Sequence, residues 1–176
     1  ESDIYKEDTF KKHIFNAYYN GRIGKLSIDF NVDGLFNSSD DDNSTTETTI
    51  LPDGSRTQSL VNNLTINENN FWATKLIFSY PVWKGNLSVG GEYSHNNRTD
   101  IYSYNSQLNL PVKATDTKIK ESSTAGFVEY GRLFGSPFAQ VGLRYERISN
   151  DYYNFGKLDS EVSQTYTDLF PSAVVS

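Results

Sequence analysis

The sequence contains no cysteine, which excludes disulfide bonds, thiol chemistry and zinc sites built on cysteine. Long apolar runs are also missing. Only 36% of the 176 residues are hydrophobic, and no stretch approaches the ~20 apolar residues of a transmembrane helix. Positive charge is scarce as well: 16 basic and 22 acidic residues give a net charge of −6, and the basic residues are scattered. This balance argues against a nucleic-acid partner.

What the chain has in abundance is an alternation of apolar and polar side chains with a period of two. In residues 25–33, 72–82 and 139–146, one set of alternate positions is mainly aliphatic or aromatic and the other is mainly polar or small. Successive side chains of a strand point to opposite faces, so each segment is predicted to be a strand with one apolar and one polar side. Long two-faced strands in a chain that is 14% aromatic are typical of an outer-membrane β-barrel.

Seven antiparallel strands are predicted, at about residues 12–20, 24–36, 57–82, 86–105, 120–132, 137–153 and 160–176. Short connections are predicted at residues 21–24, 83–85 and 133–136, each with a glycine suited to a tight hairpin. Long polar connections are predicted at about 37–56, 106–119 and 154–159. Short turns at one rim and long loops at the other predict an all-β fold, an antiparallel up-and-down meander that is part of an outer-membrane β-barrel.

The sequence does not decide the structure of two segments. Residues 67–70 (Asn-Glu-Asn-Asn) have the composition of a turn, but a turn there would spoil the alternation of rims, so we favour one long strand. In residues 120–132, neither set of alternate residues is clearly lipid-facing. One set contains Ala125, Phe127 and Glu129, and the other contains Gly126, Val128 and Tyr130.

Several short strings in the second half of the chain resemble a known family. They are residues 125–135, residues 142–146 (Gly-Leu-Arg-Tyr-Glu), residues 168–172 (Asp-Leu-Phe-Pro-Ser) and the hairpin at residues 80–94. Together they resemble the barrel of TonB-dependent outer-membrane receptors, in particular the subgroup described as the outer membrane protein β-barrel family. The first half of the chain resembles this family in pattern only.

This resemblance implies a parent barrel of about 22 strands around an N-terminal plug, which imports a scarce nutrient with energy from the inner membrane. Residues 1–176 would then be a single segment of that barrel in the bacterial outer membrane, without the plug or the remaining strands. The implied partners are outer-membrane lipid, the rest of the barrel and its plug, a TonB-type energy-coupling protein that acts through the plug, and an unidentified nutrient.

Six ionisable residues are predicted to face the lumen of such a barrel: Asp29, Asp33, Lys75, Glu92, Arg144 and Glu146. They are candidates for lining a substrate path or contacting the plug. A simpler interpretation is a solvated ladder of cross-strand pairs, each contributing about 0.2–1 kcal/mol.

Five aromatic residues are predicted near the outer rim: Tyr102, Tyr104, Tyr152, Tyr153 and Phe155. Their rings could stack on a sugar, a haem or an aromatic siderophore. We favour the alternative, a girdle that anchors the barrel at the level of the lipid headgroups. Trp72 and Tyr80 bracket the apolar side of one strand and favour the same interpretation.

No residue pattern predicts catalysis or a bound cofactor. Asp40, Asp41 and Asp42 with Glu47 could attract Ca²⁺, but they lack the spacing and central glycine of a calcium-binding loop, and an unliganded solvated loop is favoured. His13 and His95 are far apart and have no evident serine or acidic partner. We therefore expect no enzymatic activity, no cofactor and no metal.

Two classes of function remain. The first is a transport protein, in which the segment forms the wall of a nutrient-uptake barrel. The second is a soluble or surface-exposed β-barrel or sandwich that binds a small ligand or carbohydrate, with its apolar faces turned inward. Alternation alone does not distinguish inside from outside, whereas aromatic residues at strand ends favour the membrane wall.

Overall fold

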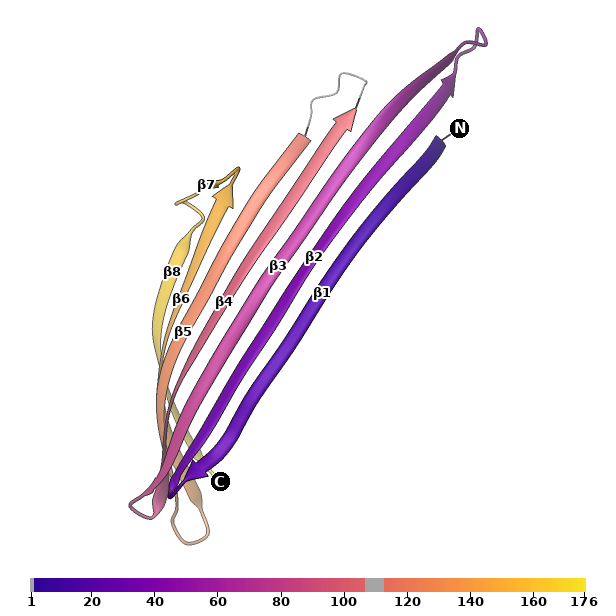
Figure 1. Cartoon of the computed structure of the whole chain (residues 1–176). Helices are drawn as coiled ribbons and strands as arrows, with labels where there is room; N and C mark the ends of the chain where they lie inside the picture. The colour runs from indigo at the N-terminus through magenta and orange to yellow at the C-terminus, as the bar shows by residue number, and fades with distance from the viewer. Residues whose placement is uncertain (1, 107–112) are drawn as a thin grey trace.

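The computed structural model describes residues 2–106 and 113–176. Its strands are β1 (Ser2–Ile23), β2 (Leu26–Ile50), β3 (Arg56–Val82), β4 (Gly85–Ser106), β5 (Lys113–Leu133), β6 (Phe138–Asn154), β7 (Lys157–Leu158) and β8 (Gln164–Val175). All pair antiparallel in one sheet that follows chain order, with β8 pairing with β6 beyond the two-residue β7 (Figure 1). The described part has no helix long and apolar enough to span a membrane. The predicted all-β meander is confirmed.

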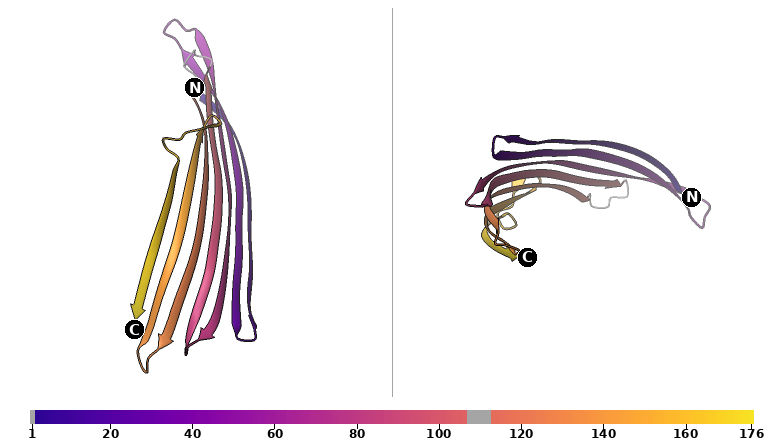
Figure 2. Two further views of the ribbon diagram at one scale, coloured as in Figure 1. Left: turned by 90° about the vertical axis from the view of Figure 1, so that its left-hand side faces the viewer. Right: turned by 90° about the horizontal axis from the view of Figure 1, so that it is seen from below.

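The sheet is curved but open. Seen from below, the strands follow an arc like part of a cylinder wall, with β1 and β8 at its two ends (Figure 2). Among the described residues only Gly34, Ser59 and Ala125 are buried, so this single layer encloses no core of its own. The soluble alternative predicted apolar faces that pack inward against one another, and the sheet does not show such packing.

The short turns lie together at the lower end of the sheet in Figure 1, near the C-terminus of the chain. Gly24 and Gly135 take positive φ there, at 60° and 75°. In the hairpin between β3 and β4, positive φ falls on Trp83 and Lys84, at 48° and 62°, and Gly85 begins the next strand. Positive φ at both central residues matches the right-handed twist of the flanking strands.

The strands at the opposite rim are longer than predicted, and all three predicted long loops require correction. Residues 37–50 belong to β2, so a turn at residues 51–55 replaces the loop predicted at 37–56. Residues 113–119 belong to β5, while 107–112 lie outside the described residues. The loop predicted at 154–159 contains a tight turn at Phe155 and Gly156 followed by β7, which adds an eighth strand.

The reason for this error is pairing with neighbouring strands. Upper β2 is paired along its length with β1 on one side and β3 on the other, so its backbone hydrogen bonds are satisfied although its side chains are polar. Polar composition predicts a loop only for an isolated segment that has no strand to pair with.

The register resolves both segments that the sequence left open. Residues 67–70 pair with β2 and β4 without interruption, so β3 is one long strand, as favoured. In β5, Val128 pairs with Val89 and Leu143, and Tyr130 pairs with Leu87 and Val141. Directly paired residues share a face, so Gly126, Val128 and Tyr130 lie on the apolar face.

The apolar side chains on that face form a continuous strip, which we call the apolar band. It comprises the apolar-face positions of residues 15–23, 26–36, 72–82, 87–93, 126–130, 139–145 and 169–175. Residues 72–82 match the 9–11 residues that a tilted strand needs to cross a bilayer. The 27 residues of β3 span about 90 Å in total, far more than the ~25 Å apolar strip of such a barrel. The upper parts of β1–β4, which are mainly polar on both faces, therefore extend well beyond the band.

The turn between β2 and β3 supplies a pH prediction. The Asp53 carboxylate accepts hydrogen bonds from the Ser55 hydroxyl at 2.7 Å and from the Ser55 backbone N–H at 2.9 Å, and these hold the pKa of Asp53 below its usual range. The contribution of this contact to stability is therefore complete above the ordinary pKa and lost as pH falls through the lowered value. We expect Ser55→Ala to raise the pKa of Asp53, measured by titrating its carboxyl ¹³C shift. An unchanged titration would contradict this assignment.

Candidate functional site: the polar face

All six residues predicted to face a lumen lie on one side of the sheet, opposite the apolar band. In the register Asp29 pairs with Ile77, Asp33 with Ala73, and Lys75 with Glu92, while Arg144 and Glu146 are two positions apart on β6. We call this side the polar face. Its side chains come from β2, β3, β4 and β6, and the alternation of the strands directs them to the same side.

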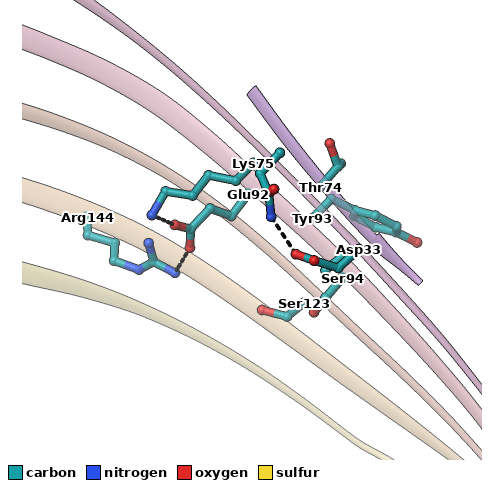
Figure 3. Close-up of a pocket in the computed structure, with 10 residues that line it drawn as sticks. Asp33, Thr74, Lys75, Glu92, Tyr93, Ser94, Ser123 and Arg144 are labelled. Atoms are coloured by element: carbon teal, nitrogen blue, oxygen red, sulfur yellow. Dashed lines mark hydrogen bonds and ion pairs between the residues drawn. The ribbon is translucent and has the colours of Figure 1, made fainter. Parts of the chain in front are cut away.

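Four of the six residues form a continuous ion-pair network, and Figure 3 shows its members Lys75, Glu92 and Arg144. The Lys75 ammonium lies 2.7 Å from one oxygen of Glu92, and the Arg144 guanidinium lies 2.8 Å from the other. Arg144 also donates to Glu146 at 3.1 Å. Glu92 thus accepts from two cations at once and links β3 to β6 across the intervening strand β5.

A small residue allows this reach across β5. Ala125 pairs in register with Glu92 on one side and Glu146 on the other, and it is only 4% exposed. Because its methyl group occupies little space, Arg144 can extend over β5 to the Glu92 carboxylate. The next polar-face residue of β5, Phe127, packs its ring over Gly90 and lies 5.9 Å from the Lys75 ammonium. Sequence reasoning missed Ala125 because alanine gives no sign of which face it occupies.

The remaining two candidates are held by amide side chains. Asn20 donates to Asp29 at 3.1 Å, and Asn16 donates to Asp33 at 2.6 Å. Further down the polar face, Gln140 donates to Glu129 at 3.1 Å. A hollow of about 240 Å³ lies over the network, lined in part by Asp33, Lys75, Glu92, Ser94, Ser123 and Arg144. The result is a polar wall in which the two positive and two negative charges of the network balance, while Asp29, Asp33 and Glu129 add negative charge.

The five predicted rim aromatics do not form one group. Tyr102, Tyr104 and Tyr152 occupy polar-face positions, whereas Tyr153 occupies the opposite face and Phe155 lies in the turn after β6. All five lie beyond the end of the apolar band, and the three on the polar face do not match the predicted girdle, because a girdle faces lipid. A contact between the three polar-face tyrosines and a ligand stays a prediction.

Aromatic residues do mark the two ends of the band itself. At the upper end the ring centroids of Trp72 and Tyr93 are 4.9 Å apart, and the stacked rings of Phe15 and Phe36 have centroids 6.0 Å apart. At the lower end the Tyr130 hydroxyl donates to the carbonyl of Trp83 at 3.1 Å. Trp72 was predicted at such a position from the sequence, whereas the other rings were not singled out, although they too lie where the apolar alternation stops.

The acidic run has no geometry for an ion. Asp40 and Asp42 point to one face of β2 and Asp41 to the other, because the run is a strand and not the predicted loop. Within residues 2–106 and 113–176, no cluster of His, Asp or Glu has the arrangement of a metal site. His13 and His95 lie on β1 and β4, with two strands between them.

Comparison with known proteins gives a family and a fold. The family model of the outer membrane protein beta-barrel family matches residues 21–176. The structure is similar to the ferric citrate transporter FecA in its unliganded form, with a TM-score of 0.53 and 12% identity over 96% of this chain and 33% of that chain. No curated protein matches in sequence.

Two further solved structures have lower TM-scores. The copper transporter OprC has 12% identity and a TM-score of 0.49, covering 94% of this chain and 34% of that chain. The siderophore receptor PiuA from Acinetobacter baumannii has the same identity and TM-score, covering 96% of this chain and 29% of that chain. The chain therefore spans about a third of the length of these structures.

Proposed function

This chain belongs to the outer membrane protein beta-barrel family, and from that premise we propose that it forms part of the wall of a TonB-dependent receptor that takes up a nutrient across the bacterial outer membrane. The observation that carries the proposal is the division of one open sheet into an apolar band of membrane height and an opposite face on which charged and polar side chains predominate. A sheet with these two faces separates lipid from water, as the wall of a wide barrel must.

Each face has a role in this proposal. The apolar band contacts outer-membrane lipid, and the polar face lines a lumen that the remaining strands of the parent protein close. The ion-pair network of Lys75, Glu92, Arg144 and Glu146 presents compensated charge to that lumen, where a plug domain would dock. Energy coupling belongs to the plug and a TonB-type partner, so the segment itself is a passive wall without enzymatic activity.

The upper parts of the strands supply the ligand-facing surface. They extend beyond the apolar band at the rim opposite the short turns, and in outer-membrane barrels the short turns face the periplasm. Tyr102, Tyr104 and Tyr152 are the candidates for contact with an incoming nutrient, because they lie on the polar face near this rim. The soluble alternative is not supported, since this family belongs to the outer membrane and the apolar side chains do not pack into a core.

Photo-crosslinking in cells tests the proposal. A photoreactive residue replaces Ser94 on the polar face or, as the matched control, Phe78 on the apolar band of the intact protein. We expect the position-94 probe to crosslink to a plug segment of the same polypeptide and the position-78 probe to label lipid. An immunoblot should place the protein in the outer-membrane fraction with a mass several times the 19.9 kDa of this chain.

Energy dependence is tested in the same experiment. In cells that lack the TonB-type protein, the crosslinks from position 94 should change in yield or position, because the plug no longer moves. An unchanged pattern, or no crosslink within the polypeptide, would contradict TonB dependence and leave only an outer-membrane barrel.

A further inference from the structure

A row of asparagine side chains runs up the polar face of β2, β3 and β4, above the ion-pair network. These residues occupy alternate positions of their strands, so they share one face and recur about every 6.8 Å along it. Asn96 pairs with Phe71, which is eight positions from Asn63 on β3, so the row is about 27 Å long. We call this row the amide ladder; its members are Asn37, Asn43, Asn63, Asn67, Asn69 and Asn96.

Most amides of the ladder lack a partner within the protein. Six asparagines have a buried side-chain oxygen that accepts no hydrogen bond from any residue in the ranges 2–106 and 113–176. Five of the six are on the polar face, namely Asn37, Asn63, Asn69, Asn96 and Asn150, and the sixth is Asn97 on the opposite face. A buried acceptor without a donor is energetically costly, so a ligand that supplies donors to this face is favoured.

The amide ladder has no excess of positive charge. On β1–β4 the cations at its level are Lys6, Lys12 and Arg98, and the same face carries Asp8, Asp41 and Asp100. The Lys6 ammonium lies 2.6 Å from the Asp8 carboxylate, and the Arg98 guanidinium lies 2.7 Å from that of Asp100. Recognition of an anion relies on cations that are free to pair with it. Two of the three cations are already paired, so this surface does not favour an anionic ligand.

Two tyrosines border the upper half of the ladder. Tyr104 pairs with Asn63, and Tyr102 pairs with Thr65 one repeat lower, on the same face. Tyr102 is 40% exposed. An exposed tyrosine offers an apolar ring for packing and a hydroxyl for hydrogen bonding. The tyrosines therefore add a surface on which the C–H side of a polar ligand can pack.

We propose that the amide ladder, with Tyr102 and Tyr104, binds a linear, uncharged oligosaccharide. A sugar hydroxyl both donates and accepts hydrogen bonds, as an asparagine amide does, whereas carboxylate and phosphate oxygens only accept. A chain of sugar rings presents hydroxyl groups along its whole length and so meets a row of regularly spaced amides. A compact metal chelate meets only part of a row about 27 Å long. This inference names the substrate class of the proposed uptake function and rests on it.

The test is a glycan array probed with the labelled intact protein in detergent, followed by calorimetric titration of each glycan that binds. We expect at least one linear, uncharged oligosaccharide to bind, and we expect ferric citrate, an anionic chelate, not to bind. The double variant Asn63→Ala/Asn69→Ala should bind the glycan at least about tenfold more weakly than wild type. The matched control Asn62→Ala/Asn70→Ala changes the same residue type on the same strand but on the opposite face. Its affinity should stay within about threefold of wild type.

A pair of tyrosine variants guards against a folding defect in the asparagine variants. Tyr102→Phe keeps the ring and should retain affinity within about threefold, whereas Tyr102→Ala should lose at least about fivefold. Three results would overturn the proposal: no uncharged glycan of the array binds, the two asparagine double variants bind equally well, or ferric citrate binds and loses affinity in Asn63→Ala/Asn69→Ala.

The ligand class and the proposed uptake function can fail separately. Glycan binding without a plug crosslink from position 94 would support the ligand class and contradict the TonB-dependent mechanism. A plug crosslink from position 94 without binding of any uncharged glycan would overturn the ligand class alone.

Discussion

Replacing Leu76 with arginine is expected to destabilise the intact protein by about 2–4 kcal/mol, as is the same change at Leu143. Leu76 is central in the apolar band, between Phe30 on β2 and Gly91 on β4, and Leu143 pairs with Val128 on β5. A guanidinium near the bilayer midplane must be dehydrated or draw water and headgroups towards it, which costs free energy. Reversible denaturant unfolding in lipid vesicles would measure the change.

Gln140→Arg is the control for this prediction. Gln140 lies on the polar face and donates to Glu129, so an arginine there stays hydrated and gains an acidic neighbour. We expect its effect on the free energy of unfolding to be within about 0.5 kcal/mol. Equal tolerance of arginine on both faces would refute the assignment of the apolar band to lipid.

Reversing the charge of Glu92 is also expected to have a large effect. We expect Glu92→Lys to lower the free energy of unfolding by about 1.5–3 kcal/mol. Glu92 receives both Lys75 and Arg144, so its replacement by lysine removes two charge-assisted contacts and brings three cations together. Solvent moderates the cost, because the three side chains are 29–45% exposed. The same unfolding assay, repeated at higher ionic strength, should recover part of the loss.

Glu121→Lys is the matched control for charge reversal. Glu121 lies on β5 and, like Glu92 on β4, belongs to the polar face. It pairs with Asn96 and Asn150 and forms no ion pair with any described residue. We expect little change in its free energy of unfolding. If both reversals had equal effects, the network would contribute no more than the general charge of the polar face.

The alternation of residue types was enough to predict the two faces of the sheet. A strand directs successive side chains to opposite sides, so Leu26, Ile28 and Phe30 had to share one face, and Asp29 and Asp33 the other. The six polar-face candidates followed from this rule. The family resemblance likewise rested on local strings of residues, and the match over residues 21–176 confirms the outer-membrane family.

Strand length and contacts across β5 depended on the tertiary structure. Residues 37–50 have a polar composition, and they are a strand only because β1 and β3 pair with both of their edges. In β5, Ala125 and Gly126 have no apolar bulk to reveal their faces, so only the register assigns them. That register also places Ala125 between Glu92 and Glu146 and so brings Arg144 to Glu92. Local alternation determines the direction of each side chain, whereas its partner depends on which residue of another strand lies opposite.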